Sequence, residues 1–135
     1  MVTPQQIRLV KGSWRLLQGI QPETIAGLFY ARLFASHPAL RKMFPADMEA
    51  QYRKLMDMLH TMVLRLDHLE ELTAEIAAMA ARHEGYGVKP VHYKYVGDAL
   101  LWTLEKGLGK DWTEEVALAW QESYATLTAS MLEEA

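Results

Sequence analysis

The chain has 135 residues, half of them apolar, which suffices to bury the core of a single domain over residues 1–135. Its net charge of -3 at pH 7 gives no electrostatic basis for binding nucleic acid, and a sequence with no cysteine excludes disulfides and thiolate-ligated metals. No apolar run approaches the ~20 residues of a membrane span, and the first residues lack the features of a signal peptide, so we expect a cytoplasmic protein outside the membrane. Residues that lose little rotamer freedom in a helix dominate the sequence, so we expect an all-α fold.

The first predicted helices are marked by their prolines. Thr3 offers an N-cap immediately before a proline, and this helix is expected to run to about Leu17. A second helix is expected to begin at Pro22 and to be interrupted at Pro38, because the residue before a proline avoids the α region. A short helical turn over 39–44 is expected next.

The third predicted helix has an apolar face that begins with an amide. We expect Asp47 to cap this helix. The spacing i, i+4, i+7, i+8 predicts one buried face, formed by Gln51, Leu55, Met58, Leu59, Met62 and Leu66.

Three further helices are predicted in the second half of the chain. The first carries an apolar stripe that ends in a histidine, formed by Leu69, Leu72, Ile76, Met79, Ala80 and His83. The next helix is expected to begin at Pro90. The last follows a segment that resembles a capping box, 111–114, in which we expect Asp111 to be the cap.

Gln51 and His83 are candidate functional residues because each is a polar residue on an apolar stripe. A buried amide or imidazole without a partner costs roughly 1–3 kcal/mol. Taken singly, each also has an ordinary interpretation: His83 as a core histidine bonded to a backbone carbonyl, and Gln51 as a partly exposed residue of a first helical turn. Tyr30, on the second helix, has one too, as a core aromatic with its hydroxyl at the surface. The functional interpretation is favoured because all three lie on inward faces of different helices, and no acid–base pair, catalytic triad or carboxylate metal cluster competes with them.

Four sequence motifs, in order along nearly the whole chain, extend this pattern. They are Phe29-Tyr30-Ala31-Arg32-Leu33-Phe34 with His37-Pro38 and Phe44; Gln51-Tyr52-Arg53-Lys54-Leu55; Arg82-His83 with Lys89-Pro90, Tyr93 and Val96-Gly97; and Trp120 with Tyr124. Together they resemble a globin, and more narrowly the haem domain of flavohaemoglobins and their single-domain bacterial relatives. The resemblance implies a globin fold, a three-over-three helical sandwich around a haem.

The resemblance also implies roles for individual residues around a haem b group. His83 would be the proximal ligand of the iron, with its other ring nitrogen held by a backbone carbonyl near Met79 and with Tyr93 orienting the ring. Tyr30 and Gln51 would be distal donors that slow the release of bound O2. The remaining contacts to the cofactor would come from Phe29, Phe44, Leu55, Val96 and Lys54, the last reaching a propionate or simply lying exposed.

Two further positions concern the surroundings of the iron, one on the proximal side and one on the distal side. A glutamate of the family that joins the proximal network matches Ala135 in an ungapped comparison from Trp120, with Glu133 and Glu134 just before it. On the distal side, His60 stands nine residues after Gln51, which is about half a turn out of phase at ~100° per residue. His60 is therefore expected to face away from the iron.

Several functions stay open at this point. The first is a protein that binds O2, and also NO and CO, for storage, delivery or scavenging, as a monomer or weak dimer. The second is an enzyme, a nitric oxide dioxygenase or weak peroxidase, which would need a separate reductase. A gas or redox sensor is a third alternative. A haem-free helical interaction module is the last, and it leaves the inward His83 and Gln51 unexplained.

Overall fold

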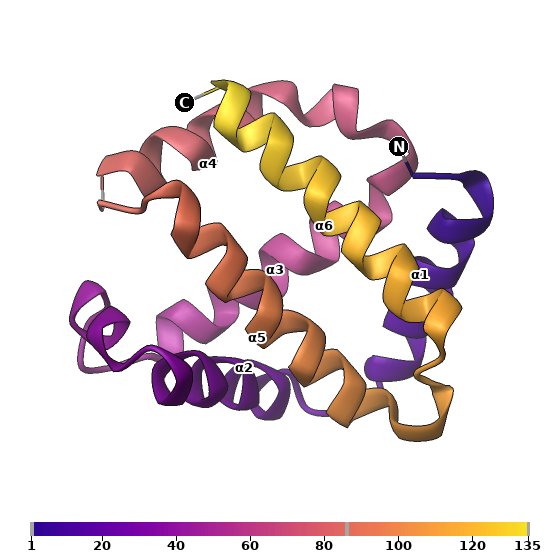
Figure 1. Cartoon of the computed structure of the whole chain (residues 1–135), viewed down its shortest axis with the longest axis horizontal. Coiled ribbons are helices and arrows are strands. Elements are labelled where there is room, and N and C mark those ends of the chain that lie inside the picture. The colour runs from indigo at the N-terminus through magenta and orange to yellow at the C-terminus, as the bar shows by residue number, and fades with distance from the viewer. Residues whose placement is uncertain (1, 86, 135) are drawn as a thin grey trace.

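The computed structural model of the protein describes residues 2–85 and 87–134, and this part of the chain folds into helices without any strand, as the all-α prediction requires (Figure 1). Long helices alternate with short 3-10 segments, and no described helix is both long and apolar enough to cross a membrane. In chain order the elements are α1 (Pro4–Leu17), α2 (Pro22–Ser36), η1 (Pro38–Met43), α3 (Glu49–Leu64), η2 (Leu66–Leu72), α4 (Thr73–Gly85), α5 (Pro90–Leu108), η3 (Gly109–Asp111) and α6 (Glu114–Glu134).

The helix starts predicted at Thr3 and at Pro22 are confirmed, whereas the expected cap Asp47 lies one residue before the observed cap position. At α1, the Thr3 hydroxyl accepts the backbone N–H of Gln6 at 3.1 Å, and the Gln6 side chain accepts the N–H of Thr3 at 2.9 Å. These two bonds satisfy donors that the first helical turn leaves without partners. Before α3 the cap position itself is Met48, but the Asp47 carboxylate accepts the N–H of Glu49 at 3.1 Å.

Two details of the second half differ from the predictions. The helix expected to carry the whole stripe up to His83 is divided, because His68 adopts non-helical angles (φ -138°, ψ 44°) within η2, and α4 itself begins at Thr73. The prediction that Asp111 caps the last helix is wrong. Asp111 lies in η3, and the hydroxyl of Thr113 accepts the N–H of Val116 at 3.2 Å. A threonine directly before the helix reaches this donor with the standard cap geometry.

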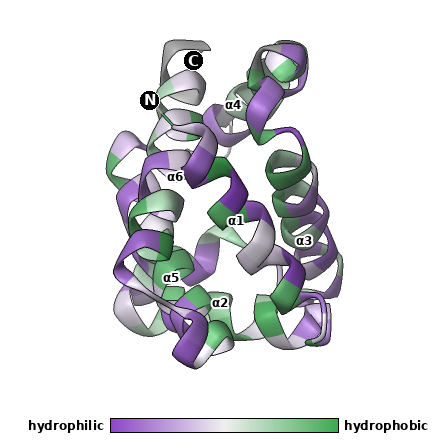
Figure 2. Ribbon diagram, turned by 90° about the vertical axis from the view of Figure 1, so that its right-hand side faces the viewer, coloured by the Kyte–Doolittle hydropathy of each residue, from purple (hydrophilic) through white to green (hydrophobic). Residues whose placement is uncertain are grey.

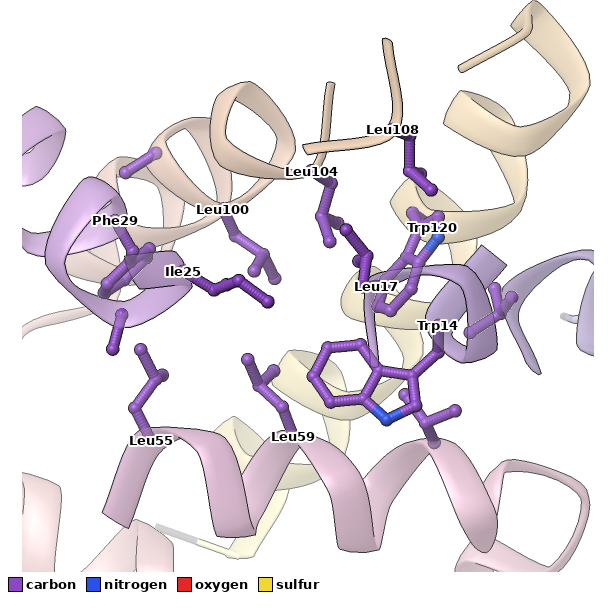
Figure 3. Close-up of a cluster of buried hydrophobic side chains, with 14 of the residues drawn as sticks. Trp14, Leu17, Ile25, Phe29, Leu55, Leu59, Leu100, Leu104, Leu108 and Trp120 are labelled. Atoms are coloured by element: carbon purple, nitrogen blue, oxygen red, sulfur yellow. The ribbon is translucent and has the colours of Figure 1, made fainter. Parts of the chain in front are cut away.

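The main hydrophobic core joins α1, α2, α3, α5 and α6, and Figure 3 shows side chains from these helices pointing toward one another. Leu17, Leu33 and Leu104 are each 1% exposed. Trp14 and Trp120 meet in this core with ring centroids 6.1 Å apart, and the Trp120 indole N–H donates to the buried Ser13 hydroxyl at 2.9 Å. Burial of these apolar surfaces is the main driving force for the fold.

A smaller hydrophobic cluster joins helix α4 with the end of η2, and α4 packs chiefly against α6. The buried residues of this cluster are Leu72, Ile76, Met79 and Ala80. Met58 and Leu69 are partly buried and contact both clusters. Helix α3, which carries Met58, alternates between hydrophobic and hydrophilic segments along its length (Figure 2). The helix that carries His83 is thus joined to the main core through a few side chains and through α6.

Candidate functional site

The side chains of Tyr30 on α2 and Gln51 on α3, which we call the distal group, are in contact with each other. The Gln51 Nε2 donates a hydrogen bond to the Tyr30 hydroxyl oxygen at 3.1 Å. Tyr30 is buried, with 4% of its surface exposed, and Gln51 is half-buried. A tyrosine hydroxyl both donates and accepts. Because its oxygen accepts from Gln51, its own proton is left for a third group.

Four aromatic rings surround Tyr30. Phe29 and Phe44 meet its ring edge to face at centroid distances of 4.8 Å and 5.5 Å. Phe34 lies at 5.8 Å, and Tyr52 stacks on Tyr30 at 5.7 Å with planes 19° apart. The burial raises the pKa of Tyr30, an effect that the hydrogen bond from Gln51 partly offsets. The hydroxyl therefore stays protonated and able to donate near neutral pH.

His83 and Tyr93, which we call the proximal group, lie at the end of α4 and the start of α5. The His83 Nδ1 is 2.6 Å from the carbonyl oxygen of Met79, the partner named from the sequence. A carbonyl only accepts, so Nδ1 carries the proton and Nε2 of the neutral ring keeps its lone pair. Nε2 is therefore the ring nitrogen that can bind a metal. The bond to the Met79 carbonyl orients the imidazole, as such bonds do in metal-bound histidines.

Tyr93 lies beside His83 and is held through its backbone. The two ring centroids are 6.3 Å apart, with planes tilted by 43°. Tyr124 of α6 donates its hydroxyl to the Tyr93 carbonyl at 2.5 Å, and burial raises the pKa of Tyr124, so this donor keeps its proton. A Cβ at Gly97 would lie 2.7 Å from Cε2 of the Tyr124 ring. The glycine therefore makes room for the ring that anchors the first turn of α5.

The other residues predicted to contact a cofactor divide into two kinds. Phe29 and Leu55 are buried in the main core, and Phe44 and Val96 are partly buried against it. Lys54 is exposed. The position that matches the family's proximal glutamate, Ala135, lies outside the described residues, as do the side chains of Glu133 and Glu134.

Sequence reasoning did not single out Phe34 or the supporting role of Tyr52. Phe34 packs against both Tyr30 and Phe44, and Tyr52 belongs to a motif in which only its neighbours had been given roles. The signal that could have found Tyr52 is its position one residue after Gln51. On a helix, that step rotates the side chain by ~100°, toward the neighbouring helix α2.

Two other histidines, His60 and His37, have partners away from Tyr30 and Gln51. His60 faces away, as expected, and its Nδ1 accepts the indole N–H of Trp14 at 3.1 Å. His37 stacks on Tyr95 with centroids 3.6 Å apart. In the part of the chain that the structure describes, no three histidine or carboxylate side chains cluster to hold a metal ion. His83 thus stands alone as the candidate ligand, which suits a metal supplied within a larger cofactor.

The chain belongs to the globin family, whose model matches residues 27–131. It is 33% identical to an uncharacterized globin-like protein of Aquifex aeolicus, over 98% of this chain and 93% of that protein. It is 34% identical to a flavohemoprotein of Deinococcus radiodurans, over 98% of this chain but 33% of that protein. The chain therefore spans about a third of the length of the flavohemoproteins it matches.

Two solved structures are similar to this chain in their arrangement of helices. An engineered carbene transferase, made from a Rhodothermus marinus protein provisionally assigned as a nitric oxide dioxygenase, matches with a TM-score of 0.86 and 30% identity over 99% of this chain and 94% of the other. A bacterial globin of Campylobacter jejuni matches with a TM-score of 0.85 and 24% identity, over 98% and 95% of the two chains. Both matches show that the arrangement of helices is the globin fold.

Proposed function

We propose that this chain is a haem-binding globin in which the Nε2 of His83 holds the iron. The observation that carries the proposal is the hydrogen bond from His83 Nδ1 to the Met79 carbonyl, which leaves Nε2 as the unprotonated nitrogen. The protein contains no cysteine for covalent attachment of the porphyrin. Haem b, held by the axial bond and by apolar contacts, is therefore the proposed form.

The proposed ligands are O2, NO and CO. Iron in a haem held by one imidazole has a free position where diatomic gases bind. The hydroxyl of Tyr30 is the proposed donor to the gas, since Gln51 donates to its oxygen and leaves its proton available. Phe44 and Phe29 pack against Tyr30, and their apolar rings limit the access of water to this donor. A donor fixed in this way favours slow release of O2, because bound O2 carries partial negative charge.

Replacement of the proposed iron ligand tests the assignment. His83→Ala is expected to abolish the Soret absorption of the purified protein, or to replace its ferrous–CO spectrum with a different one. His60→Gln is the matched control, since it removes a histidine that faces away while keeping an acceptor for the Trp14 indole. The assignment is wrong if His83→Ala retains haem with an unchanged ferrous–CO spectrum.

A second function, nitric oxide dioxygenase activity, is favoured by the distal Tyr30–Gln51 pair together with the similarity to flavohemoproteins. In this reaction NO, O2 and one electron give nitrate. A separate reductase is the proposed source of the electron. Consumption of NO over many turnovers with a reductase supplied would support the enzyme, whereas one stoichiometric burst would support a carrier.

A further inference from the structure

A cleft of about 580 Å³ opens on the outer face of α3, between this helix, the end of α1 and the start of α2. Its volume falls in the range of roughly 300–1,000 Å³ typical of small-molecule sites. The residues that decide its chemistry are Trp14, Glu23, Glu49, Tyr52, Asp57 and His60. None of these was expected from the sequence to contact the cofactor or a gas, and Tyr52 alone touches the distal group, through its stack on Tyr30.

The cleft is distinct from the candidate haem site because the residues of α3 that line the cleft and those that point into the core lie on different faces of the helix. Gln51, Leu55 and Leu59 lie on the inward face, and the two leucines belong to the main core. The helix residues that line the cleft are centred about 130° away from this face at 100° per residue. In Figure 3, Leu55 and Leu59 point from α3 into the core. A molecule in the cleft would thus meet the distal group only through the ring of Tyr52, which stacks on Tyr30.

Aromatic side chains form part of the cleft wall. Tyr52 is half-buried, and its ring stacks on that of Tyr30. Trp14 is 3% exposed, and its indole N–H donates to His60 Nδ1 at 3.1 Å. Because Nδ1 accepts this bond, the His60 ring that lines the cleft is neutral while the bond is present. The wall therefore offers the partly exposed ring of Tyr52, and the His60 ring adds no positive charge.

The charges around the cleft are unequal. Three carboxylates, on Glu23, Glu49 and Asp57, face one cation, Arg53. Within the described residues, none of these four side chains forms an ion pair. The carboxylates therefore keep their charge available, and their excess gives the cleft a negative potential. Cations also bind favourably against the faces of tyrosine and tryptophan.

We propose that this cleft binds a small organic cation that carries an aromatic ring, such as an aromatic quaternary ammonium. The cationic centre would lie near Glu23 and Asp57, which approach the cleft from α2 and α3, and the ring would pack against Tyr52. This proposal does not depend on the identity of the gas ligand or on turnover of NO.

The test is a titration of the haem-loaded ferrous–CO protein with benzyltrimethylammonium, followed by calorimetry and by the NMR signal of the Trp14 indole N–H, assigned with Trp14→Phe. Binding is expected to shift this signal. The double variant Glu23→Gln with Asp57→Asn is expected to weaken binding by about fivefold or more, since it removes two of the attracting charges. Glu75→Gln is the matched control, because Glu75 is also an exposed acid in the first turn of a helix, α4, but lies outside the cleft. It should change the affinity by less than about twofold.

Benzoate, which has the same ring with the opposite charge, should bind at least about tenfold more weakly than the ammonium. The proposal is overturned if benzoate binds equally well, if Glu75→Gln weakens binding as much as the double variant, or if the Trp14 signal does not move. Failure of the haem assignment would appear separately, in the absorption spectra of the His83→Ala protein.

Discussion

On the distal side Tyr30 is held by side chains, whereas on the proximal side His83 and Tyr93 are held by the main chain. Four rings and the Gln51 amide contact the Tyr30 side chain. The His83 ring instead bonds to the carbonyl one turn back, and Tyr93 is anchored by its own carbonyl. Distal substitutions should therefore change the chemistry offered to a gas, and proximal ones should change geometry and stability.

The largest effect is expected when the distal donor is removed. Tyr30→Phe keeps the ring among its aromatic neighbours but loses the hydroxyl. A hydrogen bond to a charged group contributes about 1.5–3 kcal/mol, so O2 dissociation should accelerate about 10- to 100-fold. Stopped-flow displacement of O2 by CO measures this rate. An unchanged rate would show that Tyr30 does not donate to the ligand.

Gly97→Ala should produce the next largest effect, and it acts on stability. The added methyl group would lie 2.7 Å from the half-buried Tyr124 ring, so this ring or one of the two helices must shift. Such overpacking typically costs about 1–3 kcal/mol in the free energy of unfolding, which urea denaturation measures.

Gly27→Ala is the control for this substitution. A Cβ at Gly27, inside α2, meets nothing within 4 Å. This variant is expected to gain about 0.5–1 kcal/mol from the higher helix propensity of alanine. Equal stability changes at the two positions would contradict the close contact between Gly97 and Tyr124.

Tyr124→Phe tests whether the Tyr124 hydroxyl positions Tyr93 or whether Tyr124 acts only through the packing of its ring. It retains the ring but removes the hydrogen bond to the Tyr93 carbonyl, which should cost about 0.5–1.5 kcal/mol of stability. If this bond also positions Tyr93 beside His83, the iron–histidine stretching frequency in the resonance Raman spectrum should shift as well. A loss of stability with an unchanged frequency would limit Tyr124 to a structural role.

The smallest effect is expected at Tyr52, which touches the distal donor without donating to a gas. Tyr52→Leu removes the ring stacked on Tyr30, and aromatic pairs contribute about 0.5–1.5 kcal/mol, so O2 dissociation should rise by about 2- to 12-fold. Tyr52→Phe keeps the stack and should leave the rate unchanged. If the two variants behave alike, the stack does not position Tyr30.

The sequence by itself determined the helical class, the starts of the first helices and the three polar residues on inward stripes. These features depend on local signals: a proline has its fixed φ, a Thr–Gln capping box closes on itself, and an apolar stripe repeats along one helix. The motif order around Tyr30, Gln51 and His83 added the family, which the globin match over residues 27–131 shows.

Only the tertiary structure decided which side chains meet across helices. Asp111, the cap expected from the sequence, lies in η3, and the hydroxyl of Thr113 caps α6 instead. The contact of Gly97 with Tyr124 and the stack of Tyr52 on Tyr30 join residues 27 and 22 positions apart. Local propensity carries no information about such pairs, since each depends on how two helices cross and on the shape that packing leaves between them.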